Sequence, residues 1–144
     1  MTIIDTHAHI YPDAIAEKAA RSIGTFYGIP MCMDGTLGQL IRHGTAAGIS
    51  RFLVHSVAIT PSRVHSVNDY LMRVCAEHPD RLIGFGTMHP GYEDVPGELD
   101  RVKAGGLHFA AVAAISDPVR EDVPAAVARC LEAGIGIKIV TGDT

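Results

Sequence analysis

Three features are missing from this 144-residue sequence, and each absence excludes a class of protein. There is no run of about 18 apolar residues, so no membrane-spanning helix is expected. The first residues carry acids and histidines where an export signal would have a basic start and a long apolar stretch. No block of basic residues forms a surface for nucleic acid, and the net charge is −4. We therefore expect neither a membrane nor a nucleic acid as partner.

Cysteine is scarce as well. Cys32, Cys75 and Cys130 are odd in number and widely spaced, so they do not indicate a disulfide framework. Reduced thiols are typical of the cytoplasm, and we expect the protein there. What remains is the composition of an ordinary globular protein, with 47% hydrophobic and 19% charged residues. A chain of this length can bury a real core, and we expect one α/β domain over residues 1–144.

Short β-branched runs alternate with helix-like stretches along the chain. The expected strands are Thr2–Thr6, Arg51–Val57, Leu82–Met88, Leu107–Ile115 and Gly136–Val140. The expected helices are Ala14–Ile23, Leu37–Ala47, Pro61–Glu77, Gly91–Ala104 and Val119–Ala133. Repeated strand–helix–strand units predict a parallel α/β sheet of about five strands joined by right-handed crossover helices.

Polar residues at the strand ends indicate where chemistry takes place. Asp5, His7 and His9 follow the first apolar run, His55 follows the second, and His89 follows the third. The carboxyl ends of parallel strands meet at one edge of the sheet, where such folds place their sites. Residues two apart on a strand point to the same side, so His7 and His9 can face one metal ion. Imidazole suits zinc, and a catalytic zinc has three protein ligands and an open position.

A single histidine at a strand end is more often a hydrogen-bonded structural residue than a ligand. His55 and His89 are therefore interpreted as structural residues at the edge of the site, while His7 and His9 are interpreted as metal ligands. Asp5 is a weaker candidate ligand. Because no third imidazole is assigned, we predict that a divalent ion, zinc first among them, binds weakly.

The stretch IIDTHAHIYPD resembles the opening strand of the amidohydrolase superfamily of metal-dependent hydrolases, in the branch that includes decarboxylases. The resemblance continues through GTLGQLIRHGTAAGISRFLVHSV, HPDRLIGFGTMHP and ELDRVKAGGLH and covers residues 1–108. It implies a partial (β/α)₈ barrel, a metal held by His7 and His9, and a small-molecule substrate. A complete barrel usually needs about 250 residues, so the later ligands of that family are absent here.

Residues 109–144 resemble another family, the P-type cation-transporting ATPases, in their phosphorylation domain. The matching motifs are Asp117-Pro118-Val119-Arg120 and Thr141-Gly142-Asp143. The resemblance implies that Asp117, Arg120, Thr141, Gly142 and Asp143 lie near a nucleotide or phosphate. No DKTGT segment is present to supply the phosphorylated aspartate. A structural interpretation is also open, in which Asp117 starts a helix and Pro118 lies in its first turn.

Two functions remain open on this sequence. One is a metal-dependent hydrolase that cleaves C–N or C–O bonds, or a decarboxylase, acting on a small carboxylate or amide and incomplete in this chain. The other is a non-catalytic fragment or chimera that retains parts of two sites. An open sheet has exposed edges that pair readily with another chain, so we expect self-association into a homo-oligomer.

Overall fold

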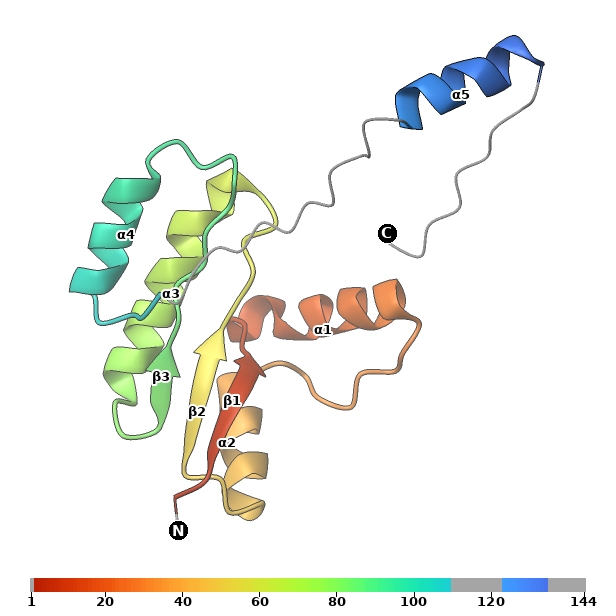
Figure 1. Cartoon of the computed structure of the whole chain (residues 1–144). Helices are drawn as coiled ribbons and strands as arrows, with labels where there is room; N and C mark the ends of the chain where they lie inside the picture. Colours follow the sequence, from red (N-terminus) through yellow and green to blue (C-terminus); the bar gives the residue numbers. More distant parts are fainter. Residues whose placement is uncertain (1, 110–122, 135–144) are drawn as a thin grey trace. The chain divides into compact units, whose positions relative to one another are not determined.

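The structure, a computed structural model, describes residues 2–109 and 123–134 (Figure 1). The chain divides into two compact units, Met1–Ala111 and Val112–Thr144, and each is described by itself. The first unit holds the sheet and four α-helices, and α5 belongs to the second. Whether both units form one domain, as the sequence predicts, stays a prediction.

A parallel three-stranded sheet forms the centre of the first unit. Its strands are β1 (Ile4–His9), β2 (Arg51–His55) and β3 (Leu82–Gly84), in the order β1-β2-β3. Both strand pairs are parallel, which confirms the predicted class of sheet. The register places His9 beside His55, after an irregularity in β1. The final residues of β1 and β2 therefore lie side by side at the carboxyl edge.

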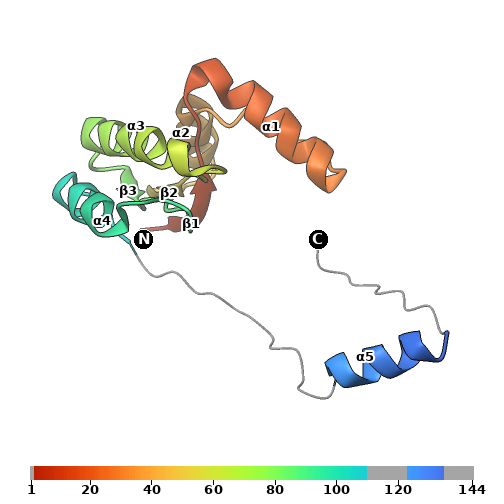
Figure 2. The same cartoon turned by 90° about the horizontal axis from the view of Figure 1, so that it is seen from above.

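Helices follow each strand. They are α1 (Asp13–Tyr27), α2 (Leu37–Ala46), the 3₁₀ turn η1 (Pro61–Arg63), α3 (Val64–Glu77), α4 (Val95–Ala104) and α5 (Val123–Glu132). Helices α2 and α3 lie on the same side of the sheet (Figure 2). Side-chain caps fix two of the helix starts, because Thr36 accepts a hydrogen bond from the Gln39 backbone and Asp94 accepts one from Gly97. Among the described residues, no helix is both long and apolar enough to cross a membrane.

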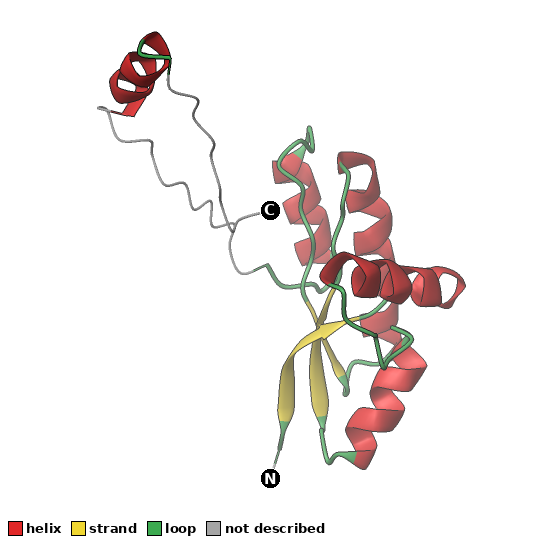
Figure 3. Ribbon diagram, turned by 90° about the vertical axis from the view of Figure 1, so that its right-hand side faces the viewer, coloured by secondary structure: helices red, strands yellow, loops and turns green. Residues whose placement is uncertain are grey.

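The core of the first unit lies between the sheet and helices α2, α3 and α4 (Figure 3). In β2, Phe52 and Val54 are completely buried, as the alternation of a half-buried strand predicts. Leu71 of α3 and Val102 of α4 pack into the same cluster. This apolar cluster makes the sheet a rigid support for the polar residues at its edge.

Several predicted boundaries differ from the structure. The first strand was expected at Thr2–Thr6, but β1 begins two residues later and ends three residues later, so that His7 and His9 lie inside it. The pairing with β2 extends the strand through its polar residues. The predicted helix Gly91–Ala104 begins only at Val95, where Asp94 caps it.

The prediction of about five strands is only partly confirmed, because the described residues form three. Of the expected strand Leu107–Ile115, one parallel bridge between Phe85 and His108 is described. The last expected strand, Gly136–Val140, lies outside the described residues. The same holds for the phosphate-motif residues Asp117, Arg120, Thr141, Gly142 and Asp143.

The second unit contains α5, which falls within the predicted helix Val119–Ala133. Gly134 has a φ of +74°, and its backbone N–H donates to the Leu131 carbonyl at 3.0 Å. Glycine adopts this left-handed conformation without the steric cost that a side chain would add. Gly134 therefore ends the helix, as the sequence predicts.

A buried carboxylate joins α3 to α4. The Oε1 atom of Glu98 accepts hydrogen bonds from Asn68 at 2.6 Å and from Arg101 at 2.7 Å. Its Oε2 atom accepts another from Arg101 Nε at 2.8 Å. The Arg101 hydrogen bonds, followed by that of Asn68, hold the pKa of Glu98 below its ordinary value of 4.5, although burial opposes them. The ionised form is thus the one that the fold favours.

We expect acid to weaken this link. Because the pKa of Glu98 is lower in the folded state, its stabilising contribution is present above about pH 4.5 and is lost as the pH falls through the lowered pKa. Glu98→Gln should lower the free energy of unfolding by about 1–3 kcal/mol at pH 7. Urea titrations should show that the difference in the free energy of unfolding between wild type and Glu98→Gln becomes smaller below pH 4.5. Glu77→Gln, at the exposed ion pair with Arg73, is the control and should change the free energy of unfolding little. A difference between wild type and Glu98→Gln that stays constant across pH would contradict the prediction.

Candidate metal centre

Three histidine side chains meet at the carboxyl edge of β1 and β2. The ring centroids lie 5.0 Å apart for His7 and His9, 4.5 Å for His7 and His55, and 4.2 Å for His9 and His55. One nitrogen from each ring lies within 4.8 Å of the others. The cluster forms because alternation directs His7 and His9 to one side of β1, and the strand register sets His55 beside His9. We call these three residues the histidine cluster.

The surroundings of the histidine cluster favour uncharged imidazoles. Burial lowers the pKa of His9, and the neighbouring His55 and His7 lower it further. Burial also lowers the pKa of His55, followed by the effect of His7. A neutral imidazole is the form that binds a metal, since protonation removes the lone pair. At neutral pH, His9 and His55 are therefore ready to act as ligands.

One nitrogen of the cluster lacks a hydrogen-bond partner among the described residues. The Nδ1 atom of His9 is buried and has no hydrogen-bond partner among the described residues. An unpaired buried nitrogen costs free energy, which a metal bond would remove. Three imidazoles match the three protein ligands of a catalytic zinc site. The residues present thus fit a divalent metal ion.

The two other predicted site residues that the structure describes, Asp5 and His89, lie outside the cluster. Asp5 Oδ1 accepts a hydrogen bond from the backbone N–H of His7 at 3.0 Å, so it supports the strand next to the cluster. His89 follows β3, and its Nδ1 accepts from the Gly91 backbone at 3.0 Å. His89 thus has the structural hydrogen bond that the sequence analysis assigned to it. The ring of His55, which was predicted at the edge of the site, lies against both His7 and His9. Whether His55 is a structural residue or a ligand stays a prediction.

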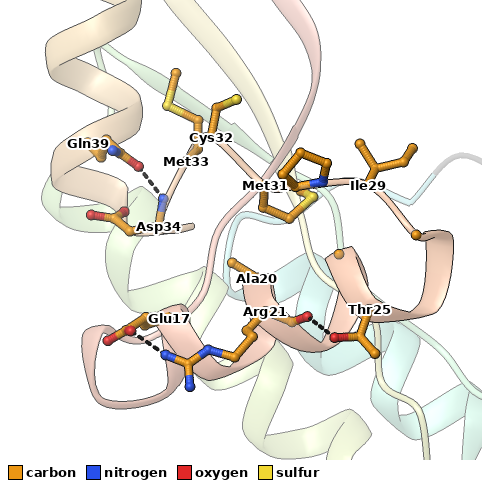
Figure 4. A pocket seen from close by; sticks show the side chains of 13 residues that line it. Glu17, Ala20, Arg21, Thr25, Ile29, Met31, Cys32, Met33, Asp34 and Gln39 are labelled. Atoms are coloured by element: carbon orange, nitrogen blue, oxygen red, sulfur yellow. Dashed lines mark hydrogen bonds and ion pairs between the residues drawn. The ribbon is translucent and has the colours of Figure 1, made fainter.

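A separate pocket of about 640 Å³ lies between α1, the loop after it and the start of α2 (Figure 4). The sequence analysis did not identify it. Two polar pairs lie in its lining: Arg21 binds Glu17 at 2.6 Å, and the Asp34 backbone donates to Gln39 at 2.5 Å. None of the three clustered histidines lines it. The histidine cluster and this pocket are therefore separate features within residues 2–109.

Comparison with solved structures finds a similar fold in a decarboxylase, an amidohydrolase-type protein and a hydratase. A 2,6-dihydroxybenzoate decarboxylase is 19% identical, with a TM-score of 0.54 over 81% of this chain and 41% of its own. A Staphylococcus aureus protein assigned to the amidohydrolases is 17% identical, with a TM-score of 0.55 over 81% of this chain and 39% of its own. A 4-oxalomesaconate hydratase from Rhodopseudomonas palustris is 18% identical, with a TM-score of 0.50 over 93% of this chain and 50% of its own. At these identities the likeness is one of fold, and the chain spans half or less of each structure.

Comparison of sequences gives a different set of relatives. A plasma membrane-type calcium-transporting ATPase 4 from Arabidopsis thaliana is 36% identical over 89 residues, which are 61% of this chain and 8% of that protein. The human plasma membrane calcium-transporting ATPase 3 is 51% identical over 75 residues, 52% of this chain and 6% of that protein. These alignments are longer than segment 109–144 and so reach beyond it. The chain thus spans less than a tenth of the length of these relatives.

No family model matches the chain. Both resemblances seen in the sequence nevertheless have counterparts, one in structure and one in sequence, and both are partial. The chain therefore resembles, in fold, part of solved structures that include a decarboxylase and an amidohydrolase-type protein, and resembles, in sequence, part of calcium-transporting ATPases.

Proposed function

We propose that the chain carries the metal-binding part of a metal-dependent enzyme of amidohydrolase type. The reaction is hydrolysis of a C–N or C–O bond, or decarboxylation, of a small carboxylate or amide. The observation that supports this most directly is the histidine cluster, with its unpaired His9 Nδ1 atom, at the carboxyl edge of a parallel sheet. In barrel and open α/β folds, catalytic groups lie at this edge.

Zinc is the metal that three imidazoles favour. Bound zinc would lower the pKa of a water molecule and polarise a carbonyl group of the substrate. His7, His9 and His55 would hold the ion, and the burial of His9 and His55 keeps them free of protons for that role. Asp5 supports His7 through the backbone hydrogen bond at 3.0 Å and takes no part as a ligand. This chemistry suits a cytoplasmic enzyme with a small-molecule substrate.

Catalysis also needs groups that the histidine cluster does not contain, and we propose that a second copy of the chain contributes to the complete site. The outer edge of β1 is unpaired within the described residues. Ile3 and Ile4 are exposed beside that edge. An exposed apolar edge strand pairs readily with another strand. Homo-oligomerisation along β1 would therefore place additional side chains next to the cluster.

The second candidate is a non-catalytic fragment or chimera. It is favoured by the sequence matches to calcium-transporting ATPases, which include 51% identity over 75 residues. In this interpretation Asp117, Arg120 and Thr141-Gly142-Asp143 are retained parts of a nucleotide or phosphate loop. Zinc would then bind at the histidine cluster without supporting turnover.

Metal counting and turnover separate the two candidates. Purified protein loaded with zinc and then dialysed should retain one ion per chain by mass spectrometry of the metal. Hydroxybenzoates and simple amides are the first substrates to test, with release of carbon dioxide or ammonia as the readout. Turnover that requires zinc supports the enzyme. Bound zinc without turnover favours the fragment, and a protein that retains no zinc contradicts the metal centre.

A further inference from the structure

A buried asparagine on α3 holds the segment that follows β3. Asn68 is completely buried. Its Oδ1 atom accepts a hydrogen bond from the Thr87 backbone N–H at 2.8 Å, and its Nδ2 donates to the Thr87 carbonyl at 3.1 Å. One amide side chain thus satisfies both backbone groups of Thr87, as a neighbouring strand would. Nδ2 also donates to Glu98 at 2.6 Å, which fixes the orientation of the amide.

Thr87 in turn holds the segment that leaves β2. Its Oγ1 atom accepts a hydrogen bond from the Ala58 backbone N–H at 3.2 Å. Ala58 lies three residues after His55, and both Ser56 and Ala58 are buried. Strand β2 ends at His55, so the sheet no longer holds the residues beyond it. The bond from Ala58 to Thr87 therefore restrains the chain directly after a member of the histidine cluster.

The same helix also holds the segment that leaves β1. The hydroxyl of Tyr70 donates to the Tyr11 carbonyl at 3.0 Å, two residues after His9. Both strands that carry the histidine cluster are thus tied to α3 just beyond their ends. The strand register brings the histidines together, while these bonds limit how far their backbones can shift.

We propose that Asn68 and Thr87 are positioning residues that set His55 against His7 and His9. This rests on the proposed function for its metal-binding half. Neither residue is a member of the histidine cluster, so each acts through the backbone beyond His55. Outer residues that orient metal ligands typically cost about 10–100-fold in metal affinity when they are mutated. Asn68 makes two hydrogen bonds with the Thr87 backbone, whereas a single hydrogen bond, from the Ala58 N–H to Thr87 Oγ1, links Thr87 to the segment after His55. Removing the Thr87 hydroxyl therefore breaks that link.

A pair of substitutions at Thr87 tests this. Thr87→Val keeps the shape of the side chain but removes the acceptor for Ala58, and Thr87→Ser keeps the acceptor. Titration calorimetry with zinc alone should show about 10-fold weaker binding for the valine variant. The serine variant should bind like wild type. Cobalt(II) alone, as a spectroscopic probe, should give an altered visible absorption spectrum in the valine variant and an unaltered one in the serine variant.

A control separates positioning from a general loss of stability. Val74 is buried at the other end of α3, away from the carboxyl edge, so Val74→Ala should destabilise the fold without changing zinc affinity or the cobalt spectrum. Equal zinc affinity in wild type and Thr87→Val would overturn the proposal. So would an equal loss of affinity in Val74→Ala.

A readout without metal keeps this test independent of the proposed function. In metal-free protein, the ring signals of His55 in a ¹H–¹³C NMR spectrum should shift in Thr87→Val and stay in place in Thr87→Ser. If wild type binds no zinc, the proposed function fails, and the His55 signals alone decide whether the residues position this side chain. Unchanged His55 signals in Thr87→Val would then refute the positioning role.

Discussion

Replacing His55 with alanine is expected to remove most of the zinc affinity of the chain. His55 supplies one of the three imidazoles whose nitrogens lie within 4.8 Å of one another, and its ring is nearest to that of His9, at 4.2 Å. Loss of a residue that orients a metal ligand costs about 10–100-fold in metal affinity. Loss of a ligand itself should weaken zinc binding by more than that. Two remaining imidazoles leave most of the coordination to water. Titration calorimetry with zinc alone at neutral pH measures the effect.

His89→Ala is the matched control for this experiment. His89 is also a histidine that follows a strand, but its Nδ1 accepts a hydrogen bond from Gly91 and it lies outside the histidine cluster. We expect this variant to keep the zinc affinity of wild type. If His55→Ala binds zinc like wild type, or if His89→Ala loses as much affinity, the three-histidine site is wrong.

The largest expected effect on stability comes from Gly44→Ala. Gly44 is buried in α2, where a Cβ atom would overlap the ring of Phe52. Phe52 is completely buried at the centre of the core, so its ring has little room to move away. Such overpacking costs about 1–3 kcal/mol, and we expect a loss at the upper end of that range. Urea denaturation followed by circular dichroism measures the free energy of unfolding.

The same helix offers the control. At Gly38 of α2, an added Cβ atom would meet only the flexible end of Arg42, at 3.4 Å. Alanine is the better helix former, so Gly38→Ala should stabilise the fold by about 0.5–1 kcal/mol. Opposite signs for the two substitutions would show that α2 approaches the sheet at Gly44. If Gly44→Ala were tolerated as well as Gly38→Ala, that close packing would be contradicted.

The sequence alone was enough to predict helix α3 but not the role of its residue Asn68. Val64, Leu71 and Val74 have helical spacing, and all are buried in α3. Asn68 lies on the same buried face, four residues after Val64. A polar residue in an apolar stripe was therefore a usable signal, since buried amides need hydrogen-bond partners. Its partner Thr87 could not be found this way, because the two are connected only by the folded chain.

By itself, the sequence determined the alternation of strands and helices, the parallel sheet and the pair His7 and His9. These features depend on local periodicity, on chain direction and on side chains two residues apart. Only the tertiary structure decided that His55 completes the cluster and that Asp5 and His89 do not. The physical reason is register: β1 and β2 are far apart in sequence, and a slip of one residue would turn His55 to the other face of the sheet. The register depends on the packing of Phe52 and Val54 into the core. That packing involves residues far away in the sequence, so the sequence of one strand does not determine it.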